Sequence, residues 1–313
     1  MFGTPTGSGE YNNMHDHHHH DHSHNVVINR AFILGILLNS SYVIAEVIAG
    51  LLYNSVALLS DAGHNLGDVA ALALSLLSFR LAKMKPKGVF TYGYKKTTVL
   101  AALTNAVILL IAIGVLGYES ATRLSHPEPV KGETIAWVAT FGIIINGLSA
   151  FIFFRNKEHD LNTKGAYLHL LTDALVSFAV VITGVVINYT NWYWLDAAVS
   201  IFILLVIVYS TWRLLLSSLR LSLDAVPANI DMDEITALVK NIAGVKNIHH
   251  THIWAMSTTE NALTTHLVLD DKLSFEEKMK LVHKIKHELL HQNIQHATIE
   301  LESIETPCED EEC

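Results

Sequence analysis

Charged residues are scarce in this chain of 313 residues, at 16% of the total against roughly a quarter in an average soluble domain. Half of the residues are hydrophobic. This composition predicts an integral membrane protein that is surrounded by a lipid bilayer. Cysteine is scarcer still: Cys308 and Cys313, both near the C-terminus, are the only two, which excludes a disulfide framework and suits a reducing, cytosolic tail. The net charge of -9 is not typical of nucleic-acid binding, so we expect no nucleic-acid partner.

Long apolar runs, in contrast, are abundant. Six of them reach about 20 residues, the length that crosses the hydrocarbon core of a bilayer. They must be helices, because lipid offers no partners for open backbone groups. The first run is too long for a signal peptide and lacks a cleavage site, so we expect it to be a true span. The predicted transmembrane helices cover residues 31–53, 55–79, 97–118, 134–154, 166–189 and 195–216.

The positions of lysine and arginine predict how these spans are oriented. The connections after the first and fifth spans carry neither residue, whereas the connection after the second span carries six. Basic loops face the cytosol under the positive-inside rule. Because the number of spans is even, both termini are then cytosolic, and we expect a multi-pass protein of the cytoplasmic membrane. The six basic residues are Arg80, Lys83, Lys85, Lys87, Lys95 and Lys96.

From about residue 222 the periodicity becomes that of a small soluble domain. The pattern predicts a helix, two strands, a longer helix and a last strand, an order typical of a compact α+β sandwich with helices on one face of a three-stranded sheet. The expected fold class is therefore an α-helical membrane protein, with six transmembrane helices followed by a cytosolic α+β ferredoxin-like domain. These elements are predicted at residues 231–242, 245–254, 261–270, 274–292 and 296–303.

Four regions follow from this organisation. We expect a His-rich disordered cytosolic tail, a transmembrane domain, a cytosolic metal-binding domain and an acidic tail that contains the cysteines. The N-terminal tail has seven histidines in the ten residues "HDHHHHDHSH", which predicts metal capture but also resembles an engineered tag. The four regions span residues 1–25, 26–221, 222–305 and 306–313.

Ionisable residues interrupt the second span at "SDAGHNLGD". Asp61, His64 and Asp68 are three and four positions apart, so they share one face of an α-helix. Each aspartate at mid-membrane costs about 2.5 to 3.5 kcal/mol on the insertion scale, which makes a chance occurrence improbable. The fifth span repeats the spacing in "HLLTDALVS", where His169 and Asp173 are four apart. The two helices therefore offer two imidazoles and two carboxylates to one site.

Such a mixed set of four nitrogen and oxygen ligands favours tetrahedral zinc, with cobalt and cadmium as alternatives, over magnesium or calcium. The ligands come from separate membrane helices and include no thiolate, so we expect transport and not a structural zinc. Imidazoles and carboxylates also bind protons, so metal entry must expel protons. An intramembrane metalloprotease would need His-Glu-x-x-His, and this chain has "HNLGD" and "HLLTD" instead, so we expect no enzymatic activity.

Three further acidic residues lie in or beside the spans. Glu46 forms a polar stripe with Asn39 and Tyr42, which predicts either a lining of the same cavity, or packing or a buried hydrogen bond. Asp61 is expected to assist the metal ligands or to carry a proton. Asp196, at the beginning of the sixth span, favours helix capping over metal binding.

Four motifs together resemble the cation diffusion facilitator family of zinc/proton antiporters: "SDAGHNLGD", "HLLTDALVS", "TYGYKKTTVLAALTNA" and "HHTHIWAMS". The resemblance implies zinc efflux in exchange for protons, by a homodimer in which His64, Asp68, His169 and Asp173 bind the transported ion. Histidine as the first ligand of the second span is associated with zinc selectivity. A broader exporter of zinc, cobalt and cadmium, or a metal importer or channel with the same ligands, remains the alternative.

The resemblance also implies a regulatory zinc site in the soluble domain. Its expected ligands are His249, His266, His283, Glu300 and Glu302, with His296, Cys308 and Cys313 as further candidates. Lys96 matches a family lysine at the beginning of the third span. We expect it to pair with Asp224, below the sixth span, and to tie together the halves of the dimer.

Overall fold

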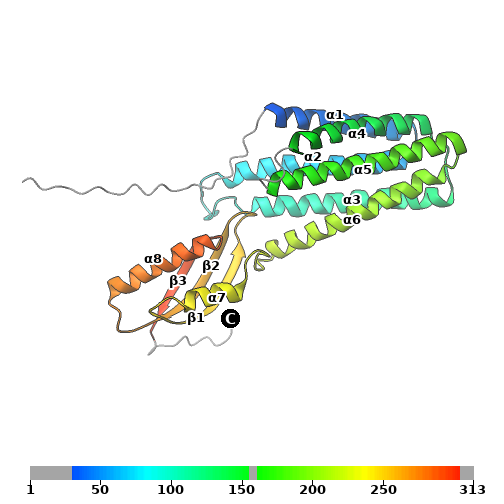
Figure 1. Ribbon diagram of the computed structural model, residues 1–313. Coiled ribbons are helices and arrows are strands. Elements are labelled where there is room, and N and C mark those ends of the chain that lie inside the picture. The colour runs from blue at the N-terminus through cyan, green and yellow to red at the C-terminus, as the bar shows by residue number, and fades with distance from the viewer. Residues whose placement is uncertain (1–29, 155–160, 304–313) are drawn as a thin grey trace, which may run out of the picture.

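The computed structural model describes residues 30–154 and 161–303. Six helices form the first part of the chain. They lie side by side, and a smaller domain of strands and helices lies beyond one end of them (Figure 1). The predicted tail of residues 1–25 and the tail with Cys308 and Cys313 fall outside the described residues. The helices are α1 (Arg30–Leu52), α2 (Val56–Ala82), α3 (Thr97–Ser125), α4 (Gly132–Phe154), α5 (Leu161–Thr190) and α6 (Trp194–Ser222).

Each predicted span corresponds to one of these helices, and the predicted fold class is confirmed. The helices α2 to α6 are long and apolar enough to cross a membrane, and α1 contains the shorter apolar segment Asn39–Leu52. The helices α3 and α6 have 29 residues each and end six or seven positions beyond the predicted spans. This difference arises because hydropathy marks only the lipid-facing part of a helix, whereas the backbone hydrogen bonds continue into polar residues such as Arg123.

The N-terminus of α2 is capped from another helix. Ser55 is its N-cap residue and accepts a hydrogen bond from the backbone N–H of Leu58. Asp196 of α6 accepts from the backbone N–H of Val56 at 2.7 Å and from Ser55 Oγ at 2.5 Å. A carboxylate at this end of a helix satisfies open N–H groups and interacts favourably with the helix dipole. Asp196 thus has a capping position, but it caps α2 and not its own helix.

Two glycines allow α4 and α5 to pack backbone against backbone. A Cβ atom on Gly184 of α5 would lie 2.6 Å from the backbone nitrogen of Ala136. A Cβ atom on Gly132 of α4 would lie 2.4 Å from the carbonyl oxygen of Gly184. No side chain fits at either distance. Small residues at such contacts are typical of membrane helices, where close van der Waals packing replaces the hydrophobic driving force.

The smaller domain has the predicted α-β-β-α-β order. It consists of α7 (Met232–Lys240), β1 (Val245–Ala255), β2 (Asn261–Leu269), α8 (Phe275–His291) and β3 (Ile294–Glu302). The sheet order is β1-β2-β3, with β1 antiparallel and β3 parallel to β2. The parallel pair is possible because α8 provides the crossover between β2 and β3.

The two helices of this domain cover one face of the sheet and enclose a hydrophobic core. Ile235 of α7, Leu263 of β2 and Ile285 of α8 are fully buried in it. Ser274 caps α8 through a capping box with Glu277, and these hydrogen bonds hold the pKa of the Glu277 carboxyl below its usual range. Residues alternate across a strand, so His266, next to buried Leu267, lies on the opposite face. That face carries the candidate cytosolic site.

Candidate metal centre

The four predicted membrane ligands come together between α2 and α5. His64 Nε2 lies 3.2 Å from Asp173 Oδ1, and His169 Nε2 lies 3.1 Å from Asp68 Oδ2 and 3.6 Å from Asp173 Oδ2. Within α2, His64 Nδ1 lies 4.0 Å from Asp68 Oδ2. With metal–ligand bonds of 2.0 to 2.2 Å, a tetrahedral zinc site needs neighbouring ligand atoms about 3.3 Å apart. The distances between ligand atoms of α2 and ligand atoms of α5 are therefore already close to those in a tetrahedral shell.

Exposure differs strongly among these ligands. The side chain of Asp173 is 4% exposed and that of His64 is 18% exposed, whereas His169 is 47% exposed. Ligand atoms of His64, Asp68 and Asp173 all lie within 4.8 Å of one another, and His169 contacts both carboxylates from the edge of this group. Three ligands thus form a compact group, and the most accessible one completes it.

The accessory residues Glu46 and Asp61 lie beside the ligands and are fully buried. Tyr42 Oη donates to Glu46 Oε1 at 2.6 Å, so the polar stripe contains the buried hydrogen bond that was one of its two interpretations. Sequence reasoning missed two partners of these carboxyls. Asn65 Nδ2 donates to Glu46 at 3.3 Å, and Ser177 Oγ donates to Asp61 at 3.1 Å. Helical spacing could have indicated both residues. Asn65 lies four positions after Asp61 on α2, and Ser177 lies four positions after Asp173 on α5.

In the cytosolic domain, the exposed face of the sheet gathers a second group of possible ligands. His249 of β1 lies directly opposite His266 of β2, which lies opposite Glu300 of β3. Glu302 Oε1 is 2.6 Å from His266 Nδ1, and Glu302 Oε2 is 3.2 Å from His249 Nε2. The His266 Nε2 atom is 3.7 Å from Glu300 Oε2. Four of the five predicted ligands are therefore neighbours.

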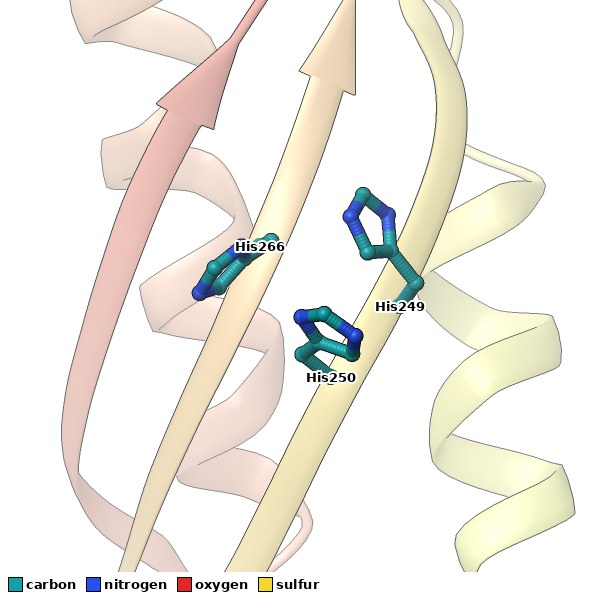
Figure 2. A group of neighbouring side chains, drawn as sticks. All are labelled: His249, His250 and His266. Carbon is teal, nitrogen blue, oxygen red and sulfur yellow. The ribbon is translucent and has the colours of Figure 1, made fainter. Parts of the chain in front are cut away.

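A third histidine joins this group because β1 is irregular. Strand alternation would place His250 on the face opposite to His249, but the register shifts between His249 and His252, and His250 adopts a positive φ of 47°. Its ring centroid is 5.0 Å from those of both His249 and His266. Figure 2 shows the three imidazoles grouped between β1 and β2. Sequence reasoning missed this position because a β-bulge leaves little trace in the residue pattern.

The remaining predicted cytosolic ligands lie elsewhere. His283 is exposed on α8, and ligand atoms of His249, His250 and His266 form the cluster without it. His296 packs its ring against Tyr92, with centroids 5.4 Å apart. Within one chain, the structure therefore does not bring these two residues to the cytosolic cluster.

Two buried atoms of the cytosolic cluster lack hydrogen-bond partners among the described residues. They are Nδ1 of His249 and Oε2 of Glu302, and the latter faces His249 Nε2 at 3.2 Å without hydrogen-bonding geometry. An unpaired buried polar atom is costly, and metal coordination is one way to satisfy it. Imidazole nitrogens with carboxylate oxygens also form a donor set that zinc accepts. The residues present thus fit a resident divalent transition metal.

The predicted pair of Lys96 and Asp224 is present within one chain. Lys96 Nζ lies 2.5 Å from Asp224 Oδ1 and also donates to the carbonyl oxygens of Leu221 and Ala255, each at 2.9 Å. The neighbouring Lys95 pairs with Glu260 in the turn between β1 and β2. The beginning of α3 is therefore attached both to the end of α6 and to the cytosolic domain. A role of Lys96 in tying two protomers together stays a prediction.

Reversing the charges of this pair is expected to restore only part of what either single substitution loses. Lys96→Asp removes the ion pair and both hydrogen bonds to carbonyl oxygens, whereas Asp224→Lys removes the ion pair alone. An exposed ion pair contributes about 0 to 1 kcal/mol. The thermal midpoint of the double variant, measured by unfolding in detergent, should therefore be higher than that of Lys96→Asp and lower than that of wild type. Full recovery in the double variant would contradict the contribution of the carbonyl hydrogen bonds.

Comparison with known proteins decides the family. Residues 32–221 match the model of the cation efflux transmembrane domain, and residues 227–304 match that of the cation efflux protein cytoplasmic domain. The chain belongs to the cation efflux, or cation diffusion facilitator, family. The resemblance carried by the four motifs is thereby confirmed, and the family is one of transporters and not of typical enzymes.

Relatives of this cation efflux protein extend over most of its length. The "Cadmium, cobalt and zinc/H(+)-K(+) antiporter" of Bacillus subtilis (strain 168) is 35% identical over 277 residues, 88% of this chain and 89% of that protein. The "Metal cation efflux system protein CzcD" of Cupriavidus metallidurans is 36% identical, over 90% of this chain and 88% of that protein. The "Zinc transporter ZitB" of Escherichia coli (strain K12) is 33% identical, over 88% and 87% respectively.

A solved structure is similar to one part of this cation efflux protein. It is the "Metal-bound C-terminal domain of the CzcD transporter from Cuprividus metallidurans", with 32% sequence identity. The match covers 23% of this chain and 99% of that one, with a TM-score of 0.22.

Proposed function

We propose that this protein exports zinc from the cytosol across the cytoplasmic membrane in exchange for protons. The observation that carries the proposal is the meeting of two His-x-x-x-Asp pairs between α2 and α5. These four side chains, His64, Asp68, His169 and Asp173, offer two nitrogens and two carboxylates at spacings near those of tetrahedral zinc. The family supports the outward direction, because both matching family models are described as cation efflux.

Proton exchange follows from the chemistry of these ligands. A zinc ion binds neutral imidazole and ionised carboxylate, so protons on these groups must leave before or as the metal binds. A transported ion must also be released, and protonation of the same groups from the acidic side weakens the site. Exchange is thus favoured whenever zinc and protons are offered from opposite sides of the membrane.

Transport can be tested with purified protein in sealed vesicles. Zinc inside the vesicles is reported by a dye, and a pH gradient is imposed with the interior acidic. We expect zinc uptake that rises with the gradient and disappears when a protonophore collapses it. Uptake that does not depend on the pH gradient would favour the alternative of a metal channel. Uptake that decreases as the interior is made more acidic would favour an importer.

Zinc affinity of the purified protein is expected to fall as the pH is lowered from about 7.5 to about 5.5. An imidazole in water titrates at about pH 6.5, so below that value protons compete with the metal for the histidine ligands. For each proton that must leave when zinc binds, the zinc affinity should fall about tenfold for every unit by which the pH is lowered below that value. Isothermal calorimetry at several pH values measures this slope, and an affinity independent of pH would contradict proton exchange at these ligands.

A broader exporter of zinc, cadmium and cobalt is the second candidate. The names of the Bacillus subtilis and Escherichia coli relatives differ on this point: the first includes cadmium and cobalt, and the second only zinc. Both other ions accept mixed nitrogen and oxygen ligands. Competition by cadmium or cobalt for dye-reported zinc uptake distinguishes the two candidates.

We further propose that the protein is a homodimer regulated by cytosolic zinc. His249, His250, His266 and Glu302 converge on the open face of the sheet, with two buried atoms left for a ligand. A metal held there would neutralise the carboxylates and allow two cytosolic domains to approach. The exposed His283 of α8 is available to a second copy. Binding that favours one arrangement of the domains would bias the membrane helices by linkage.

Residues 222–313 alone are expected to bind zinc and to become more compact or more dimeric on doing so. The domain encloses its own hydrophobic core, which supports its folding in isolation. The double variant His249→Ala with His266→Ala should lose the binding, whereas His252→Ala, an exposed histidine of the same strand, should keep it. Calorimetry and light scattering measure the two effects. Absence of binding at micromolar zinc, or unchanged binding in the double variant, would remove the regulatory site.

A further inference from the structure

A basic surface lies at the end of the helix bundle that faces the cytosolic domain, apart from both candidate metal centres. This basic loop, residues 79–92, consists of the last turn of α2 and the first part of the connection to α3. It contains no acidic residue, although the net charge of the whole protein is -9. Its four basic residues are all exposed, and they are Arg80, Lys83, Lys85 and Lys87.

The two halves of the connection between α2 and α3 differ in what they contact. At its end, Lys95 pairs with Glu260 and Lys96 pairs with Asp224. The four cations of the basic loop, in contrast, form no ion pair with any residue that the structure describes. Neighbouring like charges repel one another, so an anionic partner from outside the chain would stabilise the loop.

Apolar side chains are exposed among these cations. Val89 is 88% exposed, and Met84 and Phe90 are 52% and 49% exposed. The loop has a defined shape, because Gly93 adopts a positive φ of 71° and a Cβ atom there would lie 3.1 Å from the carbonyl oxygen of Met84. The chain thus folds back on the end of α2. Basic residues mixed with exposed apolar ones are typical of segments that lie in a membrane interface.

The level of the basic loop relative to the bilayer follows from the aromatic residues of α6. Trp194 and Trp212 are both exposed, and their separation along the helix is about 27 Å, close to the thickness of a hydrocarbon core. A hydrogen bond from the backbone of Val56 to Asp196 sets the beginning of α2 at the level of Trp194. The same rise brings α2 out of the hydrocarbon at about residue 75. Arg80 and the loop after it therefore lie in and just beyond the headgroup layer.

We propose that the basic loop is a docking surface for anionic phospholipids of the leaflet on the side of the cytosolic domain. The four cations pair with lipid phosphates, and Val89 enters the layer between headgroups and acyl chains. Charge complementarity supports this partner, since that leaflet is negatively charged and clusters of four or more basic residues beside a transmembrane helix bind its lipids. A soluble anion would account for the cations but not for the exposed apolar side chains.

Lipid binding can be measured with the full-length protein in an uncharged detergent. We expect it to bind a fluorescent phosphatidylglycerol, and we expect unlabelled phosphatidylcholine not to displace that lipid. Each lysine near the membrane surface contributes about fivefold to the affinity, so a triple replacement by glutamine should weaken binding about 100-fold. The same triple replacement by arginine keeps the charge and should bind as wild type does. The three positions are Lys83, Lys85 and Lys87.

A matched control removes the same charge from the cytosolic domain and should bind phosphatidylglycerol as wild type does. It is the triple glutamine variant of three exposed lysines, Lys240, Lys284 and Lys286. Wild-type binding by the glutamine variant of the basic loop, or an equal loss in the control, would overturn the proposal. Displacement of the lipid by an equal concentration of glycerol phosphate would also overturn it, because the site would then be one for a soluble anion.

Two further measurements test the apolar contact and the place of the loop. Val89→Ser should weaken phosphatidylglycerol binding severalfold without a change of charge, and an unchanged affinity would overturn the apolar contact. In nanodiscs, the backbone amides of residues 83–92 should exchange hydrogen more slowly with phosphatidylglycerol present than in phosphatidylcholine alone. The amides of residues 270–274, between β2 and α8, should not respond. Equal exchange of residues 83–92 in the two lipids would overturn the proposal, whatever the protein transports.

Discussion

Zinc uptake into vesicles is expected to fall to background when Asp173 is replaced by alanine. This carboxylate is the most buried of the four proposed membrane ligands and contacts both histidines, at 3.2 Å and 3.6 Å. Its loss leaves three ligands for a tetrahedral ion and removes the negative charge that faces the two imidazoles. Since changes one shell further out cost 10- to 100-fold in metal affinity, we expect a loss of at least about 100-fold here. Dye-reported uptake and calorimetry of the purified variant measure the two effects.

The same result is expected for His64→Ala, Asp68→Ala and His169→Ala. Each variant should remain a folded membrane protein, which size-exclusion chromatography in detergent can verify. His287→Ala, which removes an exposed histidine of α8, is the matched control and should transport at the wild-type rate. Transport near wild type in any two of the four ligand variants would contradict the proposed transport site.

Gly184→Ala is expected to destabilise the protein strongly, although it adds a single methyl group. The new Cβ atom would meet the backbone of α4 at 2.6 Å, so the two helices would have to separate along their contact. Overpacking of this kind costs about 1 to 3 kcal/mol, and the cost is greater when backbone and not a flexible side chain must move. The thermal midpoint in detergent should therefore decrease markedly.

Gly147→Ala on α4 separates this steric effect from the helix propensity of alanine. No atom lies within 4 Å of a Cβ atom at that position. Replacing glycine in a helix interior then stabilises by up to about 1 kcal/mol, so the thermal midpoint should be unchanged or higher. A similar decrease in both variants would show that close packing of α4 on α5 is not what Gly184 provides.

Helical spacing was sufficient to predict which four side chains lie together in the membrane domain, because their geometry is mostly local. His64 and Asp68 share a face of one helix whatever surrounds it, as do His169 and Asp173 on the other. Because ionisable side chains are costly in contact with lipid, the polar face of α2 was expected to pack against the polar face of α5. The same reasoning identified six helices and the order of the cytosolic elements, since apolar periodicity reports which side of an element is buried.

Features that depend on tertiary contacts were not accessible in this way. The capping of α2 by Asp196 joins positions 140 residues apart, and the attachment of Lys95 to Glu260 joins positions 165 apart. His250 enters the cytosolic cluster through a bulge that reverses its expected face. The hydrophobic pattern indicates on which face of a helix or strand a residue lies. It does not indicate which distant residue contacts it, or where the register of a strand shifts.

The division of the proposed membrane ligands between two helices would make metal affinity depend on how the helices are displaced. The distances within each His-x-x-x-Asp pair are fixed by the helix, whereas the 3.2 Å and 3.1 Å distances between helices change as soon as α5 slides or tilts against α2. Neither helix alone holds more than half of a tetrahedral shell. A shift of about an ångström between the two would therefore convert the proposed site into two weak half-sites. On the proposed function, the same four side chains would bind an ion at low concentration on one side of the membrane and release it on the other.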